Sequence, residues 1–242
     1  MPRFFVENEA ICADRITISG EDARHISHSL RMKPGEKLTV CGPDGTEYLC
    51  AAEHFTAGEV SLAILSRAPS ANEPPYRVTV YQSLVRGERF DAVIQKSVEF
   101  GAAAVVPVAA ARSEVRLSAA DAEKKRVRWQ RIAQEAAKQC GRAYIPAVAP
   151  PVPFEKAVSE AGGTRLFCYE NERTLHLRDA VARAQDKSEF SIFIGPEGGY
   201  SAEEAALAVS LGADAVSLGR RILRTESAAP FVLACLSYAL EV

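Results

Sequence analysis

The sequence predicts an α/β protein in two parts, a small β-rich domain followed by a parallel sheet with helices on both faces. Short strand-like runs fill the first part and are separated by turn signals such as Lys33-Pro34-Gly35. Beyond the Pro- and Ser-rich segment Ser66–Tyr76, apolar strands alternate with helical patterns, which is typical of a covered parallel sheet. We therefore expect domains at residues 1–70 and 71–242.

The composition is that of an ordinary globular protein, with 48% hydrophobic and 25% charged residues among 242. It excludes a disordered chain, a collagen and a coiled coil. The longest uncharged runs, Phe100–Ala111 and Ser227–Leu240, are shorter than the roughly 18 residues that a membrane span needs. Charged residues interrupt the N-terminal segment, so we expect no signal peptide. Six cysteines without C-x-x-C or metal-ligand spacing indicate free thiols in a cytoplasmic protein and no metal site.

Local patterns place the individual elements. In the first part we expect a small β-barrel, whose strands are Arg3–Val6, Ile16–Ile18, Lys37–Cys41, Glu47–Ala52 and Val60–Leu65. One helix is expected between the second and third of these strands, over Glu21–Arg31, with Ser19 as its N-cap. In the second part, the expected strands are Arg77–Leu84, Ala103–Val108, Arg165–Tyr169, Phe190–Ile194 and Ala215–Leu218. The expected helices there are Arg89–Phe100, Asp121–Gln139, Ala202–Leu211 and Thr225–Leu240.

A glycine-rich turn follows the apolar strand that ends at Ile194. Gly195, Gly198 and Gly199 allow left-handed backbone and the close approach of another molecule. Ser201 and Glu204 have the spacing of a capping box, which predicts that a helix starts directly after the turn. Open α/β sheets bind ligands at the carboxyl ends of their strands. A turn with a purely structural role is the alternative, and the pattern matches neither a dinucleotide nor a phosphate loop.

Arginines border a second loop between a strand and a helix. Three of them, in the range 220–224, surround the apolar pair Ile222-Leu223. Thr225 or Ser227 is expected to cap the helix that follows, with Pro230 in its first turn. Apolar residues between cations suit a ligand with an aromatic ring and an anionic partner. A solvated charged loop is the alternative.

These motifs occur together in a known family. The segments Arg3–Val6, Gly195–Ser201 and Leu218–Ser227 resemble the RsmE family of ribosomal RNA methyltransferases, which belongs to the SPOUT superfamily. The segments Gln95–Gly101 and Arg131–Arg142 are similar to that family too, so the resemblance covers nearly the whole chain. It is specific because the G-P-E-G-G and L-G-x-R-I-L-R-T-E-S-A elements occur in the family's order.

The resemblance implies a PUA-like β-barrel RNA-binding domain at residues 1–70. It implies a SPOUT methyltransferase domain with a C-terminal trefoil knot at residues 71–242. S-adenosylmethionine would be the cofactor, and N3 of one uridine in small-subunit (16S) ribosomal RNA, within an assembled subunit, would be the acceptor. The family works as a homodimer, for which the apolar segment Phe231–Leu240 offers a surface. No membrane and no metal partner is expected.

Under this resemblance, three strand-end loops form the cofactor pocket. Their glycines expose backbone groups to the adenine and ribose, Ile222 and Leu223 enclose the ring, and a carboxylate near the sulfonium is attractive. The expected cofactor-binding residues are Tyr169, Glu170, Gly195, Pro196, Glu197, Gly198, Gly199, Leu218, Gly219, Ile222, Leu223 and Thr225.

Methylation at N3 needs both an in-line approach and the loss of the N3 proton. Arg224 and Arg3 are candidates to hold the uridine or its developing anion. Glu197 or Glu226 would accept the proton, and the sequence does not choose between them. Glu226 equally suits a helix-start carboxylate.

Candidate RNA contacts lie in both parts of the chain. Cations attract phosphates, and the expected contacts are Arg3, His25, Arg31, Lys124, Arg128 and Arg131. A solvated helix face accounts equally well for the basic run Lys124–Arg131, in which Trp129 is expected to be packed.

Other functions fit parts of the sequence. A different SPOUT enzyme would methylate a ribose 2′-hydroxyl with the same cofactor. A non-catalytic RNA-binding protein would need no cofactor, and a small-molecule α/β enzyme would leave the β-rich domain without a purpose. The fold by itself does not decide among them.

Overall fold

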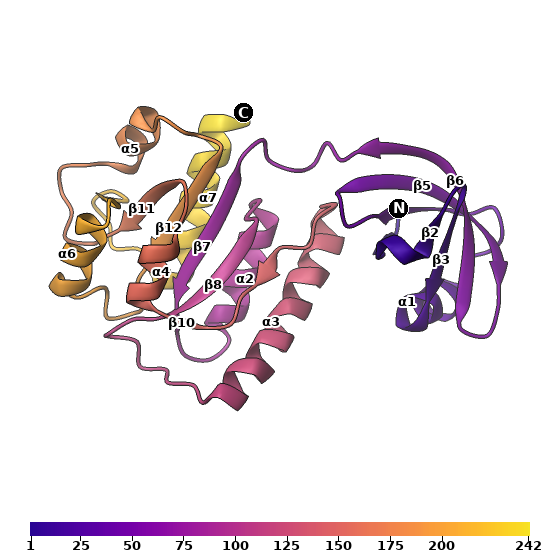
Figure 1. Ribbon diagram of the computed structural model, residues 1–242, viewed down its shortest axis with the longest axis horizontal. Coiled ribbons are helices and arrows are strands. Elements are labelled where there is room, and N and C mark those ends of the chain that lie inside the picture. The colour runs from indigo at the N-terminus through magenta and orange to yellow at the C-terminus, as the bar shows by residue number, and fades with distance from the viewer. The chain divides into compact units, whose positions relative to one another are not determined.

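The computed structural model describes all residues from 1 to 242, which divide into two compact units (Figure 1). The first unit comprises Met1–Glu73 and Ala137–Tyr144, and the second comprises Pro74–Ala136 and Ile145–Val242. The expected α/β class with a parallel sheet is confirmed. None of the helices combines the length and the apolar content that a membrane crossing requires.

A curled six-stranded sheet, a half-barrel, makes up most of the first unit. Its elements are β1 (Arg3–Phe5), η1 (Asn8–Ala10), β2 (Ile11–Cys12), β3 (Arg15–Ser19), β4 (Lys37–Cys41), β5 (Thr46–Phe55) and β6 (Glu59–Pro69). The strand order is β1-β4-β5-β6-β3-β2, in which only the β1–β4 pair is parallel. Alternate side chains face inward, and Ile16, Leu38 and Leu62 are fully buried there.

The helix expected over residues 21–31 is shorter and irregular. An α-helix, α1 (Gly20–Arg24), continues into the π-helix η2 (His25–Ser29), and the chain leaves it through Arg31 at φ 51°. Ser19 occupies the N-cap position as expected, but its side chain makes no capping hydrogen bond.

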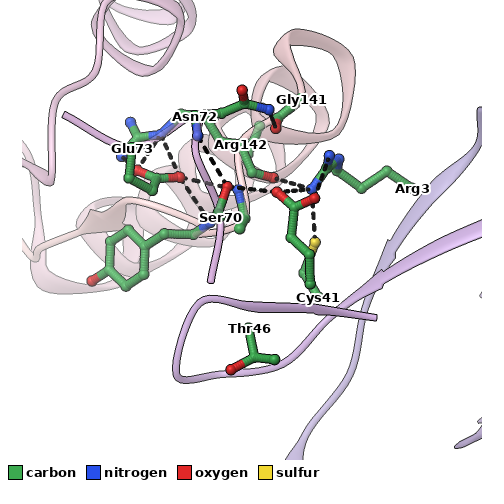
Figure 2. A network of polar contacts seen from close by, with 12 residues as sticks. Arg3, Cys41, Thr46, Ser70, Asn72, Glu73, Gly141 and Arg142 are labelled. Carbon is green, nitrogen blue, oxygen red and sulfur yellow. Dashed lines mark hydrogen bonds and ion pairs between the residues drawn. The ribbon is translucent and has the colours of Figure 1, made fainter. Parts of the chain in front are cut away.

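The last turn of α3 (Ala119–Cys140) belongs to the first unit, together with the residues that follow it as far as Tyr144. Figure 2 shows how this segment is held. The Glu73 carboxylate accepts hydrogen bonds from Arg142 Nε at 3.1 Å and from Arg142 Nη2 at 2.6 Å. It also accepts bonds from the next two backbone N–H groups at 3.0 and 3.2 Å. From the sequence, this segment is expected in the domain at residues 71–242, because no pattern in it indicates the first unit.

A parallel sheet with the strand order β10-β8-β7-β12-β11-β13 organises the second unit, and β9 also pairs with β8. Its strands are β7 (Arg77–Ser83), β8 (Ala104–Ala109), β9 (Ala147–Val148), β10 (Val152–Pro153), β11 (Thr164–Cys168), β12 (Glu189–Ile194) and β13 (Asp214–Val216). Its helices, besides α3, are α2 (Arg89–Glu99), α4 (Phe154–Glu160), α5 (Leu177–Arg183), α6 (Ala202–Ser210) and α7 (Thr225–Leu240).

Strand β12 is buried at every position from Phe190 to Ile194, as expected for a central parallel strand that is covered on both faces. On one face, Phe193 joins a cluster with Phe167, Tyr200 and side chains of α4 and α6. Helices α2 and α7 pack against each other, and α7 also contacts β12. The continuous apolar runs that predicted buried strands are explained by this double cover.

The bounds of α7, Thr225–Leu240, are as expected, but the place of Pro230 within the helix is not. The helix begins at Thr225, so Pro230 is its sixth residue and lies inside the helix rather than in its first turn. Because proline lacks an N–H, the carbonyl of Glu226 receives no helical hydrogen bond from that position. Neither Thr225 nor Ser227 caps the helix, since Arg224 occupies the N-cap position without a side-chain capping bond. The trefoil knot stays a prediction.

We expect Glu73→Ala to lower the free energy of unfolding of the first unit by about 3 kcal/mol, because it removes the carboxylate that forms an ion pair with the buried Arg142 guanidinium. Chemical denaturation followed by circular dichroism measures the change. The matched control is Glu123→Ala, which removes an exposed partner of Arg126 and should change stability by less than about 0.5 kcal/mol. Equal effects of the two variants would contradict this account of the segment.

Candidate active site

A cavity of about 540 Å³ opens at the carboxyl ends of β11, β12 and β13 in the second unit. Parallel pairing places these strand ends at one edge of the sheet, so three loops that are distant in the sequence meet there. The lining residues are Arg89, Cys168, Tyr169, Glu170, Ile194, Gly195, Pro196, Glu197, Gly198, Gly199, Ser217, Leu218, Gly219, Arg221, Ile222, Leu223, Arg224, Thr225, Glu226 and Ala228.

The glycine turn after β12 is held by the predicted capping box. Ser201 Oγ accepts a hydrogen bond from the N–H of Glu204 at 3.1 Å, and Glu204 Oε2 accepts one from the N–H of Ser201 at 2.9 Å. The second oxygen of Glu204 accepts a bond from the N–H of Ala111 at 2.7 Å, which ties the turn to the end of β8. The buried ring of Tyr200 packs against Gly195, and burial raises the pKa of the Tyr200 hydroxyl.

Glycine is required at two cavity positions for different reasons. Gly199 has φ 66°, and a side chain there would run into the carboxylate of Glu170. Gly219 has φ 105° with open space around it, so only the backbone conformation excludes other residues. The backbone at Gly219 is therefore open to a bound molecule, whereas the Glu170 carboxylate lies against Gly199.

Thr225 links two of the loops. Its hydroxyl donates a hydrogen bond to Gly195 O at 2.7 Å and accepts one from Gln82 Nε2 at 2.9 Å. Sequence reasoning missed Gln82, because a single glutamine at the end of an apolar strand carries no motif.

The carboxylates at the cavity have different surroundings. Glu197 Oε1 forms an ion pair with Arg89 Nη1 at 2.8 Å, and both side chains are partly exposed. Glu226 Oε2 is buried and has no hydrogen-bond partner. A buried carboxylate oxygen without a partner is unfavourable unless a ligand supplies one, so Glu226 is the more available acceptor. Arg89 was also missed by sequence reasoning, because it is the first residue of α2 and belongs to no recognisable pattern.

The residues that line the cavity include exposed side chains and one buried thiol, that of Cys168. Arg224 and Arg221 are exposed, and Ile222 is 73% exposed although it lines the cavity. Burial raises the pKa of the Cys168 thiol to about 12, so this thiol is neutral and unreactive at ordinary pH.

The structure brings together all the residues predicted to bind a cofactor, and Arg224, Glu197 and Glu226 with them. No cluster of histidine, cysteine and acidic side chains is arranged to hold a metal ion. The roles of the individual residues stay predictions.

Arg3 does not line the cavity. Its guanidinium in the first unit contacts Glu47 Oε1 at 3.0 Å and Cys41 Sγ at 3.0 Å, and it is largely buried (Figure 2). These contacts give Arg3 a structural role, which the sequence analysis did not anticipate. The His25 ring packs 6.1 Å from that of Phe4, and Arg31 is exposed.

The positive charge of the basic run on α3 is partly neutralised by ion pairs with acidic residues. No sequence pattern indicated these pairs. Arg128 forms an ion pair with Asp91 of α2, whereas Lys124 and Arg131 are exposed without an ion pair. Trp129 is buried against Phe90, with ring centroids 4.3 Å apart, so it is packed as expected.

Comparisons with known proteins agree over both units. A family model described as an RNA methyltransferase domain matches residues 72–237, and a model described as an RNA methyltransferase PUA domain matches residues 18–64. The ribosomal RNA small subunit methyltransferase E of Bacillus subtilis is 32% identical over 250 aligned positions, which cover 100% of this chain and 98% of that protein. The protein of the same name from Synechocystis is 30% identical and covers 99% of this chain, with 78% of its own length aligned.

Solved structures show the same similarity. The crystal structure of a ribosomal RNA small subunit methyltransferase E from Neisseria gonorrhoeae, bound to S-adenosyl methionine, has a TM-score of 0.88 at 31% identity. The alignment covers 99% of this chain and 98% of that one. A Legionella pneumophila structure with the bound cofactor SAM has a TM-score of 0.85 at 32% identity, over 98% of this chain and 97% of that one.

Proposed function

The chain belongs to the RNA methyltransferase family, and on that premise we propose that it transfers a methyl group from S-adenosylmethionine to small-subunit (16S) ribosomal RNA. The observation that carries the proposal is the cavity at the strand ends, where glycine backbone, an apolar pair and carboxylates meet. The expected family and enzyme class are confirmed by the similarity, which extends over the full length of the chain.

The residues of the cavity fit S-adenosylmethionine. Gly219 leaves backbone groups open where a side chain is excluded, which suits hydrogen bonds to the adenine and ribose. Leu223 and Ile222 offer apolar contacts for the ring. The carboxylate of Glu170, which reaches the turn beside Gly199, adds negative charge that favours a cationic ligand. When bound, this cofactor supplies a methyl group on a positively charged sulfur.

We propose N3 of one uridine as the acceptor atom, in line with the family resemblance. Nucleoside analysis of ribosomal RNA from cells with and without the protein tests this choice. N3-methyluridine that disappears with the protein and returns on complementation is expected. Loss of a 2′-O-methylated nucleoside instead would assign the chain to the ribose-methylating alternative.

Glu226 is proposed as the group that accepts the N3 proton. Its buried Oε2 has no partner and lines the same cavity, whereas Glu197 is already paired with Arg89. A carboxylate in contact with the N3–H takes up the proton as the new bond to nitrogen forms.

The remaining assignments complete the proposal. Residues 1–70 are proposed to bind RNA as a PUA-like domain and residues 71–242 to form the methyltransferase domain with its knot. RNA binding is proposed to involve six basic residues: Arg3, His25, Arg31, Lys124, Arg128 and Arg131. For Arg3 and Arg128, phosphate would compete with the ion pairs that these side chains already form. An assembled small subunit in the cytoplasm is the proposed substrate and location.

A homodimer is proposed as the working unit. Phe231 and Tyr238 are spaced by seven residues on α7 and are exposed, by 38% and 79% respectively. Ile222 adds a third exposed apolar side chain from the loop before α7. Large exposed apolar groups on one face of a helix mark a surface for association.

We expect calorimetry to detect binding of S-adenosylmethionine, and Gly199→Ala to weaken it by at least tenfold. The added Cβ meets the Glu170 carboxylate and also strains the backbone at φ 66°. Gly212→Ala is the matched control, because φ there is 87° but the surrounding space is open and outside the cavity. Similar affinity for both variants would contradict the assignment of the cavity.

Glu226→Gln is expected to slow methyl transfer by about a hundredfold, because the amide cannot accept the proton. Cofactor affinity should stay within about threefold, as the side chain keeps its size. Glu197→Gln, tested beside it, should retain most of the rate. A larger loss in Glu197→Gln than in Glu226→Gln would reverse the roles of the two acids. Single-turnover methylation of small subunits measures both variants.

Arg224→Ala should slow methyl transfer by about a hundredfold, the effect of losing one donor to a developing negative charge. The exposed guanidinium at the start of α7 is proposed to hold a uracil oxygen. Cofactor affinity, measured on the same variant, should change little. A near-normal rate would remove Arg224 from the mechanism.

Light scattering at micromolar concentration should give twice the mass of one chain for the wild type. The double variant Phe231→Asp, Tyr238→Asp should give a single-chain mass, because it introduces charges into the proposed interface. Val209→Asp changes another exposed apolar residue, on α6, and should leave the mass unchanged. A fully active wild type of single-chain mass would refute the dimer.

A further inference from the structure

Gln82 is a polar side chain in the core of the second unit. It lies at the carboxyl end of β7, aligned with Ile194 of β12, and it is fully buried. It does not line the cavity. Burying an amide is unfavourable unless its hydrogen bonds are replaced, and Gln82 Oε1 has no partner at all. The contacts of its Nε2 group are therefore the interactions that must favour glutamine here.

The Nε2 group donates hydrogen bonds to Thr225 Oγ1 at 2.9 Å and to Ser83 O at 3.1 Å. A threonine hydroxyl has one hydrogen. When it accepts a bond from Gln82, that hydrogen is directed to its other partner, Gly195 O, at 2.7 Å. The three residues thus form a directional chain of hydrogen bonds from β7 through the start of α7 to the glycine turn.

The hydrogen bond from Thr225 to Gly195 O holds a peptide group that has no other hydrogen-bonding atom. The peptide between Gly195 and Pro196 has no N–H, because proline lacks one. Its carbonyl oxygen is therefore the single hydrogen-bonding atom of that group, and Thr225 occupies it. The ring of Tyr200 packs against Gly195, so the orientation of this peptide is determined by contacts from two sides.

We propose that Gln82 is a positioning residue for cofactor binding: through Thr225 it fixes the Gly195–Pro196 peptide, and with it the turn that faces the cavity. The proposal rests on the proposed function, because it concerns the same cavity. Gln82 touches neither the cavity nor the reacting atoms, so it acts on the affinity for S-adenosylmethionine rather than on the chemical step.

The test uses purified full-length protein and S-adenosylmethionine as the probe, with binding followed by calorimetry. Gln82→Glu keeps the shape but removes the donor, so the Thr225 hydrogen is drawn to the carboxylate and away from Gly195 O. Thr225→Val removes the donor to Gly195, and Thr225→Ser restores it. We expect about tenfold weaker binding for Gln82→Glu and Thr225→Val, and near-normal binding for Thr225→Ser.

Steady-state methylation of small subunits separates positioning from general damage. KM for S-adenosylmethionine should rise by about tenfold in Gln82→Glu, while kcat stays within about threefold. Ser97→Ala is the control, because Ser97 is a fully buried polar residue of α2 with an unpartnered hydroxyl outside the cavity. It should leave both constants unchanged. Thermal unfolding of every variant reports any loss of stability separately.

The outcomes are distinct. Wild-type protein that binds no S-adenosylmethionine would overturn the proposed function and this inference with it. Wild-type protein that binds, together with Gln82→Glu and Thr225→Val variants that bind equally well, would overturn the inference alone. A failure of Thr225→Ser to restore binding would do the same. If Gln82→Glu does not fold, Gln82→Met, which removes the donor without adding a charge, is measured in its place, and binding equal to that of the wild type would overturn the inference.

Discussion

Parallel pairing of β7, β12, β11 and β13 is the constraint on which the rest of the second unit depends. Because these strands run in one direction, every loop that leaves a carboxyl end emerges at the same edge of the sheet. Burial of β12 on both faces fixes its register, and this determines where the glycine turn that follows begins. The cavity is a consequence of this arrangement, and its loops need only short local contacts to complete it.

Those local contacts are mostly side chain to backbone. Glu204 secures the far end of the glycine turn, and Thr225 secures its beginning. Polar groups are used in this way where the chain must stay open to a ligand, since an apolar side chain at the same positions would fill the space. Glu226 differs from Glu197 and Glu204, because its buried Oε2 has no partner.

Much of the fold and most of the cavity could be predicted from local sequence patterns. Three recognisable patterns lie within a few residues of one another: the apolar run to Ile194, the glycines that follow it, and the capping box. Gln82 and Arg89 could not be found in this way, because their importance arises from residues more than a hundred positions away. The position of Pro230 was misjudged although the start of α7 was predicted correctly, because the segment from Thr225 to Ala229 already exceeds one helical turn.

The discontinuity of the first unit has a consequence for synthesis. Chains emerge from the ribosome N-terminus first, and domains generally fold as units when their residues are available. The half-barrel strands are complete at Pro69, yet Glu73 obtains its partner only when Arg142 has been made. Between these events the nascent N-terminal sheet lacks one part of its own structure. Its final stabilisation therefore coincides with the translation of the middle of the chain rather than with the end of its own strands.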